Sequence, residues 1–542
     1  MAEGLSFPRH SKNLSDQFRS LGYWNDDTLT TYIEKWAKET PKKVAIVAPN
    51  KEVTFKEWYT QSLKLANGLL KLGLKRGDVI AIQYPNTPEF LISYIGIALM
   101  GGVMCTLHMP YRAGEMAPLM NHGKTKAVIC GDSDNKYNAP STMVKLKGIV
   151  PTLEHIIVIG EKTSDHYNFS SLIEESNATP IVDPPIASDP CILCFTSGTS
   201  ASPKGVVRTY ETLTANARIY SPTIKLNSED RVMVAPPFTH VFGLTCGTLA
   251  LCWGSTNVLM PLFTPELYAD RLINAKPTIV FSAPAHVAAT IKAGLLDNVD
   301  LSSLKEVIIA GSVCPPEVAA NLERRMPNGR SGQLFGMTET ILIMQTPLDE
   351  KPEIRHSSTG RKTEGIDIRI VNPLDDKDVQ TGEEGELLLR GYAIMAGYLN
   401  NDEANRTAFT KDGFFRSGDL ATSDPDGNVI ITGRVKDIIN RGGIKINPTD
   451  IENILQAHPN IILAALVPMK DDVLGERICV FAPLTMDTKL TFKEMTEHLK
   501  KNGIAKMRWP EKLQIIDEMP MTPTRKIQKG ELVKILEHQP SL

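Results

Sequence analysis

Short apolar runs alternate with amphipathic stretches along most of this chain of 542 residues. Spacing of apolar residues predicts helices over 54–72 and 89–100, with short strands before and after each of them. Such alternation is typical of α/β layers, in which helices cover a largely parallel sheet. The predicted strands of this region lie at 44–47, 78–83, 103–107, 232–235, 258–260, 278–282 and 307–309.

The pattern changes after Gly360, where acidic, glycine-rich turns separate strands predicted at 366–371 and 386–390. This segment is expected to be richer in β structure. From about Gly433 helices and strands mix again, and Asn447-Pro448 has the residue types of a helix N-cap and first helical position. The predicted fold is therefore α/β, with two α/β layered subdomains, a β-rich subdomain and a small α+β C-terminal domain.

Composition excludes several classes of protein. The formal net charge is −3, so nucleic acid is not expected as a partner. Eight cysteines spread over the chain do not form a disulfide framework. The uncharged stretches 90–107 and 243–260 contain glycines and are interpreted as helix, turn and strand rather than membrane spans. Met1–Lys12 lacks a signal-peptide pattern, so a soluble cytoplasmic protein with no transmembrane segment is expected.

The segment 194–206 carries the most specific chemistry. Five hydroxyl residues, two glycines and Lys204 lie between two apolar runs. Hydroxyls and free backbone N–H groups are donors for phosphate oxygens, and a lysine adds a positive charge. It is not a Walker A loop, because Pro203 occupies the place of the second glycine. The alternative interpretation is an ordinary turn between strands.

This segment resembles the phosphate loop of the adenylate-forming superfamily, which includes acyl-CoA synthetases, aryl acid–AMP ligases, peptide-synthetase adenylation domains and luciferases. Ala201 stands where that family usually has glycine. Further motifs in family order support the resemblance. They begin at Pro237-Phe238-Thr239-His240, Gln333-Leu334-Phe335-Gly336, Ser417-Gly418-Asp419, Gly433-Arg434-Val435-Lys436 and Pro520-Met521-Thr522.

The resemblance implies an ATP and AMP site. Phe335 would stack on adenine, Thr338 would donate to the α-phosphate, and Glu339 would hold Mg²⁺. Asp419 would accept from the ribose hydroxyls. Taken singly, Glu339 also fits a helix-start acid and Asp419 an ordinary turn residue. The complete set of nucleotide-binding residues implied is Thr196, Ser197, Gly198, Thr199, Ser200, Lys204, Ser312, Phe335, Gly336, Thr338, Asp419, Arg434 and Lys526.

Lys526 matches the catalytic lysine of the family and would stabilise the charge on the transferring group. Arg525 precedes it where glycine is usual, and Lys529 lies close by, so the register of the motif is open at this stage. A solvated surface lysine is the alternative interpretation. His240, Thr338 and Glu339 complete the catalytic residues that the resemblance implies.

Two further sets of residues concern the acid and the thiol. Lys436 falls at the family's hinge, which divides an AMP-binding domain, 1–433, from a mobile C-terminal lid, 434–542. Lys445 would contact CoA, although a surface lysine is equally compatible. The acyl pocket is assigned to His240, Val241, Phe242, Ala310, Gly311 and Met337, and the thiol step to Gly442, Gly443 and Lys445.

The sequence therefore predicts an ATP-dependent acid–CoA ligase that uses ATP, Mg²⁺ and CoA and proceeds through an acyl-adenylate. Dihydroxybenzoate enzymes of the family place asparagine after the gating histidine, whereas this chain has Val241. An aliphatic, alicyclic or simple aromatic monocarboxylate, fatty acids included, is thus expected. Loading of an acyl carrier protein and a catalytically weak acyl or nucleotide binder are the alternatives. The sequence leaves the oligomeric state open, a dimer included.

Overall fold

The computed structural model describes residues 7–133, 137–161, 166–196, 204–486, 488–522 and 527–538. The chain divides into two compact units. The first contains Met1–Asp367 and Leu389–Phe415, and the second contains Ile368–Leu388 and Arg416–Leu542. The boundary predicted at residue 433 is of another kind, because it separates a mobile lid, 434–542, from the rest of the chain. It stays a prediction.

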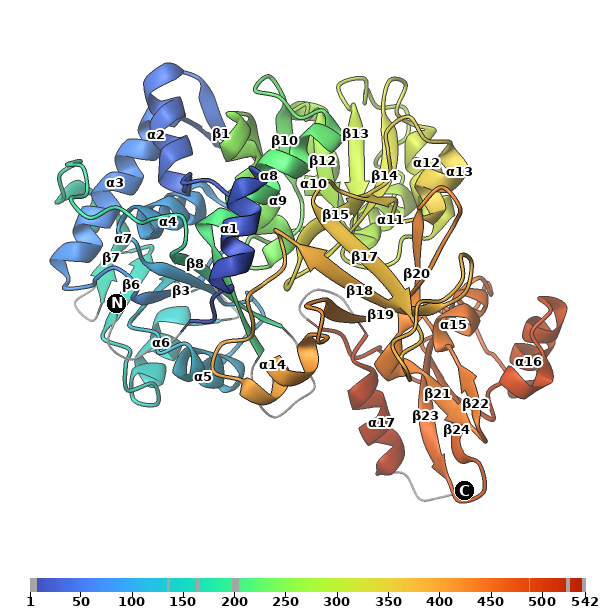
Figure 1. The fold of residues 1–542 in the computed structure, drawn as a ribbon. Coiled ribbons are helices and arrows are strands. Elements are labelled where there is room, and N and C mark those ends of the chain that lie inside the picture. The colour runs from blue at the N-terminus through green and yellow to red at the C-terminus, as the bar shows by residue number, and fades with distance from the viewer. Residues whose placement is uncertain are drawn as a thin grey trace. The chain divides into compact units, whose positions relative to one another are not determined.

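A nine-stranded sheet in the first unit has the order β16-β15-β14-β13-β12-β10-β11-β1-β2 (Figure 1). Its centre is parallel, since β10 pairs with β11 and β12, β12 with β13, and β13 with β14. The carboxyl ends of these strands therefore lie along one edge. The strands are β1 (Val44–Ala48), β2 (Lys51–Thr54), β10 (Arg231–Val234), β11 (Thr256–Leu259), β12 (Ile279–Ser282), β13 (Glu306–Ile309), β14 (Arg330–Met337), β15 (Ile341–Gln345) and β16 (Arg361–Lys362).

A seven-stranded sheet in the same unit has the order β7-β6-β5-β3-β4-β8-β9. Its last two strands form an antiparallel hairpin, whereas β3, β4, β5, β6 and β8 pair in parallel. The strands are β3 (Val79–Gln83), β4 (Val103–Thr106), β5 (Ala127–Gly131), β6 (His155–Ile159), β7 (Tyr167–Asn168), β8 (Pro190–Thr196) and β9 (Lys204–Thr209).

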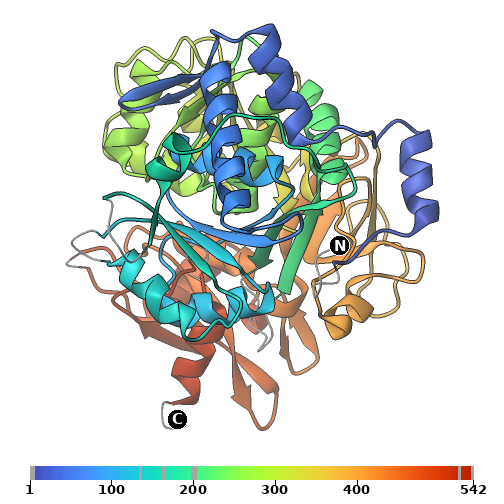
Figure 2. The same cartoon turned by 90° about the vertical axis from the view of Figure 1, so that its left-hand side faces the viewer.

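Helices α2 (Leu29–Glu39), α3 (Phe55–Lys71) and α4 (Pro88–Leu99) pack on one another, and Figures 1 and 2 show them side by side. Eleven residues of α4 are buried, which explains why its sequence carries no charge after Glu89. Helix α9 (Val241–Trp253) is equally apolar and is followed by Gly254 and strand β11. Both suspected membrane stretches are thus helix, turn and strand, as predicted. No helix in the described ranges is long and apolar enough to cross a membrane.

The remaining helices of the first unit connect these strands or pack beside them. They are α1 (Lys12–Ser20), α5 (Ala113–His122), α6 (Ala139–Lys147), α7 (Phe169–Glu174), α8 (Tyr210–Tyr220), α10 (Pro265–Asn274), α11 (Pro284–Lys292), α12 (Pro316–Glu323), α13 (Pro352–Ser357) and α14 (Asp402–Ala408).

The second unit contains two sheets. One is four-stranded, β17 (Ile366–Val371), β18 (Gly385–Gly391), β19 (Phe415–Ser423) and β20 (Val429–Arg434), and confirms the β-rich segment. The other has the order β22-β21-β24-β23 with β25 beside β24. Its strands are β21 (Ile439–Arg441), β22 (Ile444–Ile446), β23 (Ala465–Asp471), β24 (Gly475–Ala482) and β25 (Lys512–Ile515).

Strands β23 and β24 are buried on both faces. Ile478 and Val480 belong to one hydrophobic cluster with α15 (Pro448–Gln456) and α16 (Phe492–Lys501), whereas Cys479 and Phe481 belong to another with α17 (Lys529–Glu537). Figure 1 shows α17 on the opposite side of this sheet from α15 and α16. Successive side chains of a strand point to opposite faces, so two-sided burial requires a continuous apolar run.

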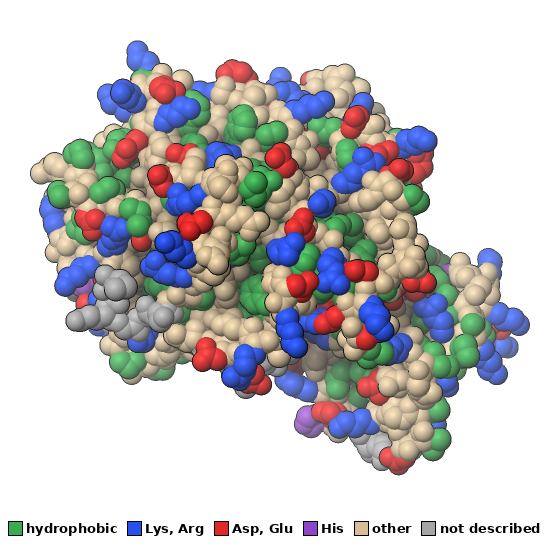
Figure 3. Space-filling view, in the orientation of Figure 1, with side chains coloured by type: hydrophobic (Ala, Val, Ile, Leu, Met, Phe, Trp, Pro, Cys, Tyr) green, Lys and Arg blue, Asp and Glu red, His purple; other side chains and the backbone are tan. Residues whose placement is uncertain are grey.

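Helix α15 begins where the sequence predicts. Asn447 is the N-cap, its side chain accepts from the Thr449 N–H, and Pro448 is the first helical residue. The boundaries of other predicted elements agree closely, and β17 has the predicted limits, residues 366–371. Over most of the face seen in Figure 3, basic and acidic side chains are interspersed, as the nearly balanced charge predicts.

Candidate active site

The hairpin of β14 and β15 carries the predicted adenine and phosphate residues. Phe335 pairs with Met344 and Met337 with Ile341, so Thr338, Glu339 and Thr340 form the turn. A Cβ on Gly336 would lie 2.0 Å from the Ile341 carbonyl oxygen, so only glycine fits. Ile341 has a φ of +52°. A β-branched residue in this region costs about 1–3 kcal/mol and persists only where neighbours fix the backbone.

Glu339, the predicted metal ligand, is 6% exposed. The Tyr398 hydroxyl donates to Glu339 Oε1 at 2.8 Å. Burial raises the pKa of Tyr398, and the neighbouring Glu339 charge raises it further, so the phenol stays protonated. Within the part of the chain that the structure describes, no hydrogen bond reaches Glu339 Oε2. One carboxylate oxygen is held and the other can accept a ligand.

A buried arginine supports the same turn. Arg208 on β9 is 0% exposed and donates to the carbonyl oxygens of Thr338 and, at 2.6 Å, Ala393. Burial lowers its pKa to about 10, although the Glu339 charge opposes the shift. Arg208 therefore stays cationic near neutral pH. It fixes the backbone of the Thr338-Glu339 turn and places a positive charge in its surroundings.

The hairpin of β8 and β9 brings Thr196 and Lys204 opposite each other in register. Lys204 Nζ lies 5.3 Å from the centroid of the Tyr398 ring, within cation–π range. Ser197, Gly198, Thr199 and Ser200, which the sequence assigns to phosphate binding, lie outside the described residues.

The predicted acyl residues lie at the carboxyl edge of the nine-stranded sheet. His240 follows β10, while Ala310, Gly311 and Ser312 follow β13. Val241 and Phe242 are 3% and 8% exposed, and Ala310 is 3% exposed. Parallel strand pairing places these segments on the same edge as Phe335 and Met337. The structure thus groups residues that are distant in sequence.

His240 is the N-cap of α9, and its Nδ1 accepts from the Phe242 N–H at 3.2 Å. A second histidine, His108, stacks on it with ring centroids 6.0 Å apart. His108 Nδ1 lies 3.3 Å from Thr239 Oγ1. Burial lowers the pKa of His108 to about 4, so that ring is neutral near pH 7.

In the second unit, β19 and β20 pair Asp419 with Arg434. Arg434 Nε donates to Asp419 Oδ1 at 2.7 Å, and Asp419 is 7% exposed. The Asp419 N–H donates to Ser417 Oγ at 3.0 Å, and that hydroxyl donates to the Leu387 carbonyl. The two predicted ribose residues are therefore brought together, with the carboxylate held by a cation.

Gly442 and Gly443 form the two-residue turn between β21 and β22. Their φ values, +57° and +88°, fit a type I′ hairpin turn. Lys445 pairs with Asn440 across the hairpin and is exposed. Lys436 lies in a 3-10 turn, Val435–Asp437.

Lys526 lies outside the described residues. Lys529, the other candidate in this motif, is 2.8 Å from Glu452 Oε1 and 3.9 Å from Asp437 Oδ2. Its side chain is 20% exposed. Because two carboxylates already engage Lys529, its position favours a structural role and supports Lys526 as the catalytic candidate.

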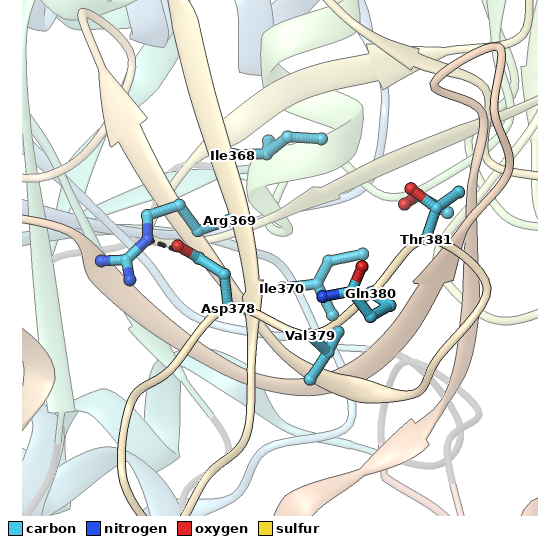
Figure 4. A pocket seen from close by; sticks show the side chains of 8 residues that line it. Ile368, Arg369, Ile370, Asp378, Val379, Gln380 and Thr381 are labelled. Atoms are coloured by element: carbon cyan, nitrogen blue, oxygen red, sulfur yellow. Dashed lines mark hydrogen bonds and ion pairs between the residues drawn. The ribbon is translucent and has the colours of Figure 1, made fainter.

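A groove of about 340 Å³ lies beside β17 in the second unit. Arg369 Nε donates to Asp378 Oδ1 at 2.8 Å across it (Figure 4). None of the residues assigned to the acid or nucleotide lines this groove, and its lining is mixed polar and apolar. The residues that line it are Ile368, Arg369, Ile370, Asp378, Val379, Gln380, Thr381 and Ser423.

The residues present fit a Mg²⁺ that is shared with phosphates. Among the described residues no cluster of three or more His, Cys, Asp or Glu forms an all-protein metal site. Mg²⁺ is commonly held by one or two carboxylates together with substrate phosphates and water. Glu339, with Oε1 fixed by the Tyr398 hydroxyl, supplies one such carboxylate.

Sequence reasoning missed Arg208, Tyr398 and His108. Arg208 had a signal, because it is a charged residue directly after the apolar pair Val206-Val207 in strand β9. Tyr398 had none, since its partner Glu339 is 59 positions away in the chain.

Comparisons with known proteins identify the family of the chain. Residues 33–399 match the AMP-binding enzyme family, and residues 450–526 match the AMP-binding enzyme C-terminal domain. The vibriobactin-specific 2,3-dihydroxybenzoate-AMP ligase of Vibrio cholerae is 30% identical over 528 residues, which cover 96% of each chain. The medium-chain fatty-acid–CoA ligase of Escherichia coli is 29% identical over 517 residues, covering 94% of this chain and 91% of that ligase.

The fold has close counterparts among solved structures. The anthranilate CoA ligase AuaEII in complex with anthranoyl-AMP superposes with a TM-score of 0.85 at 23% identity, over 94% of this chain and 98% of that one. The family match spans more than half of the chain and includes the hairpin that carries Thr338 and Glu339. The chain belongs to the AMP-binding enzyme family and is an adenylate-forming ligase.

Proposed function

We propose that the protein is an acid–CoA ligase that activates an apolar monocarboxylic acid with ATP. In the first step the acid carboxylate attacks the α-phosphorus of ATP, an acyl-adenylate forms and pyrophosphate leaves. In the second step the CoA thiol attacks the acyl carbon, giving the thioester and AMP, and the thiol proton is released to solvent. The geometry around Glu339 is the observation that carries this proposal.

The first step brings two anions together, so cations must screen them and hold the line of attack. Lys204 is assigned to the phosphates of ATP and Thr338 to the α-phosphate. Lys526 is assigned to the charge that develops on the transferring group. Mg²⁺, held by Glu339, would neutralise phosphate charge.

Phe335 is assigned to stacking on adenine, with Gly336 allowing close approach. Asp419 is assigned to the ribose hydroxyls, because an ionised carboxylate accepts from both. Its ion pair with Arg434 fixes the carboxylate orientation. The remaining nucleotide-binding assignments are Thr196, Ser197, Gly198, Thr199, Ser200, Ser312 and Arg434.

The acid is assigned to the edge formed by His240, Val241, Phe242, Ala310, Gly311 and Met337. Val241 offers no hydrogen-bonding group to a phenolic hydroxyl and is 3% exposed. A site that lacks such a partner does not select for a hydroxylated ring. An aliphatic, alicyclic or unsubstituted aromatic acid is therefore favoured.

For the second step, Lys436 is assigned to the hinge of a mobile lid, 434–542. Movement of this lid would exchange Lys526 for the Gly442-Gly443 turn at the acyl-adenylate. A glycine turn lets a pantetheine chain approach the backbone, and exposed Lys445 is assigned to a CoA phosphate.

Loading of an acyl carrier protein is the second candidate, and the similarity to the dihydroxybenzoate-AMP ligase of Vibrio cholerae favours it. A panel of carboxylic acids with ATP, Mg²⁺ and CoA, read by mass spectrometry, distinguishes the two. A CoA thioester supports the first proposal. An acyl-adenylate that accumulates in the presence of free CoA supports carrier loading. If neither product forms, the result supports a catalytically weak acyl or nucleotide binder and contradicts both the acid–CoA ligase and the carrier-loading proposals.

A further inference from the structure

We propose that Tyr398 is a positioning residue that orients the Glu339 carboxylate toward Mg²⁺ and holds Lys204 against its ring. The inference rests on the role proposed above for Glu339. It assigns a function to a residue that lies outside the motifs named in the sequence analysis.

Tyr398 contacts two charged residues through different parts of its side chain. Its hydroxyl donates to Glu339 Oε1 at 2.8 Å, and its ring centroid lies 5.3 Å from Lys204 Nζ. Tyr398 is 6% exposed, so both contacts lie in a largely water-excluded place. One side chain therefore connects the phosphate-loop lysine with the metal carboxylate.

The backbone around Tyr398 is fixed on three sides. Its N–H donates to Asn405 Oδ1 at 2.7 Å, and Asn405 Nδ2 donates back to the Tyr398 carbonyl at 2.9 Å. The Leu399 N–H donates to the Gly205 carbonyl at 2.8 Å, directly beside Lys204. Such clamping leaves the ring little freedom to change its position.

A second link joins the same segment to Glu339. The Met395 N–H donates to the Glu339 carbonyl at 2.8 Å. Glu339 is thus held through both its backbone and its side chain by residues 395–398. This double attachment indicates that the segment sets the carboxylate geometry rather than merely covering it.

The chemistry of a phenol suits this position. A lysine or arginine in place of Tyr398 would neutralise Glu339 and compete with a divalent cation. A tyrosine hydroxyl is a neutral hydrogen-bond donor near pH 7. It orients the carboxylate through a hydrogen bond instead of an ion pair, and the Lys204 ammonium is attracted to the ring face. Both charges stay available to MgATP.

The test measures Mn²⁺ binding to the protein–ATP complex by electron paramagnetic resonance, without any acid, so that no turnover is involved. Tyr398→Phe keeps the ring and loses the hydroxyl. We expect Mn²⁺ affinity to fall about 10-fold to 100-fold, as is typical when a partner of a metal ligand is removed. ATP affinity without metal is expected to stay within about 2-fold, because the ring contact with Lys204 persists.

Two further variants separate the contributions. Tyr398→Leu removes the ring as well, and is expected to weaken metal-free ATP binding beyond the level of Tyr398→Phe. Tyr392→Phe is the matched control, since Tyr392 is another buried tyrosine of the first unit and, within the described residues, its hydroxyl makes no hydrogen bond to Glu339. It is expected to bind Mn²⁺ as the parent protein does. Circular dichroism and melting temperature verify that each variant is folded.

Glu339→Gln distinguishes failure of this inference from failure of the proposed function. If Glu339→Gln loses Mn²⁺ affinity and Tyr398→Phe does not, the inference about Tyr398 is wrong and the role of Glu339 stands. If Glu339→Gln binds Mn²⁺ normally, both are wrong. Equal ATP affinity in Tyr398→Leu and Tyr398→Phe would contradict the contact with Lys204.

Discussion

The two units hold the carboxylates that are assigned to the nucleotide site in different ways. Glu339 and Asp419 are almost equally buried, 6% and 7% exposed. Glu339 accepts from the neutral Tyr398 hydroxyl at 2.8 Å, whereas Asp419 accepts from the Arg434 guanidinium at 2.7 Å. One carboxylate has a neutral donor as its direct partner, and the other is paired with a cation.

This difference matches what each carboxylate is proposed to bind. A divalent cation is attracted by negative charge, and a neutral donor orients Glu339 without forming an ion pair with it, although the Arg208 cation lies in the surroundings. Ribose hydroxyls are neutral, and a carboxylate that accepts from them loses little by being paired with an arginine. The partner of a buried carboxylate therefore indicates the charge of its ligand.

The largest expected effect concerns Lys526, whose positive charge is assigned to the transferring group. Lys526→Ala is expected to abolish acid-dependent exchange of pyrophosphate into ATP, because the developing charge on the transferring group loses its cation. Lys529→Ala is the matched control. Its ion pair with Glu452 is structural, so this variant is expected to melt at a lower temperature and to keep exchange.

The reverse result, with exchange lost in Lys529→Ala and retained in Lys526→Ala, would mean that Lys529, three positions after Lys526, is the catalytic lysine of the motif. It would also mean that the ion pair of Lys529 with Glu452 must open during the reaction.

The comparison of the two carboxylates is tested directly by amide substitution. Glu339→Gln is expected to slow adenylation by about 100-fold or more, since metal stabilisation of the transition state is worth several kcal/mol. Asp419→Asn is expected to raise KM for ATP by about 10-fold, the value of one hydrogen bond to a charged group. Initial rates over a range of Mg²⁺ concentrations check both.

Only Glu339→Gln should change the Mg²⁺ dependence. If Asp419→Asn changes it to the same extent, the partner of the carboxylate does not predict its ligand, and the distinction drawn here fails.

A smaller effect is expected at the glycine turn of the second unit. Gly443→Val is expected to leave pyrophosphate exchange within about 2-fold and to slow thioester formation about 5-fold to 30-fold, because φ of +88° costs an L residue about 1–2 kcal/mol. Gly443→Asn is the control, as asparagine tolerates this conformation better. Single-turnover measurements of the two half-reactions check the partition, and equal losses in both would contradict it.

Much of this architecture could be predicted from the sequence. Apolar periodicity located the strands that carry the site, and Asn447-Pro448 located the start of α15. The resemblance placed Thr338 and Glu339 in one motif and separately named Asp419 and Arg434. The sequence motifs did not show that the last two are partners, because that follows from the register of β19 and β20.

The residues that hold the candidate site residues in position were harder to predict. Tyr398 reaches Glu339 only because residues 395–399 return to the β8–β9 hairpin, a contact made by the tertiary fold. Arg208 was visible as a charge directly after an apolar pair in β9, but its carbonyl partners Thr338 and Ala393 are far away in sequence. Local patterns identify groups that do chemistry more readily than the groups that hold them.

Two structural carboxylates of the first unit extend the comparison to stability, with smaller effects. Glu323 accepts from Arg355 at 2.6 Å, and its Oε2 lies 3.0 Å from His356 Nε2. Burial alone would raise its pKa, but hydrogen bonds from Arg355, the Ser331 N–H and His356 lower it from 4.5 to about 2. Glu306 is fully buried and accepts from Gln345, and burial raises its pKa from 4.5 to about 8, with Arg355 and Lys225 opposing.

The signs of the two pH dependences are opposite. A lowered pKa means that Glu323 stabilises the fold above pH 4.5 and that this contribution is lost as pH falls toward about 2. A raised pKa means that Glu306 stabilises the fold below pH 4.5 and that its contribution is lost as pH rises toward about 8. Glu323→Gln should therefore destabilise the protein at pH 7 by about 1–3 kcal/mol, the cost of leaving a buried charged partner unsatisfied.

Glu306→Gln should instead stabilise it near pH 8, where the buried parent carboxyl ionises and Arg355 and Lys225 offset the cost of burial only in part, and should have little effect at pH 4. Urea unfolding at pH 4, 7 and 8 measures both variants against the parent. If both variants shift stability with the same sign at pH 8, the partners of a buried carboxylate do not determine its charge state. The contrast between Glu339 and Asp419 would then lose its physical basis as well.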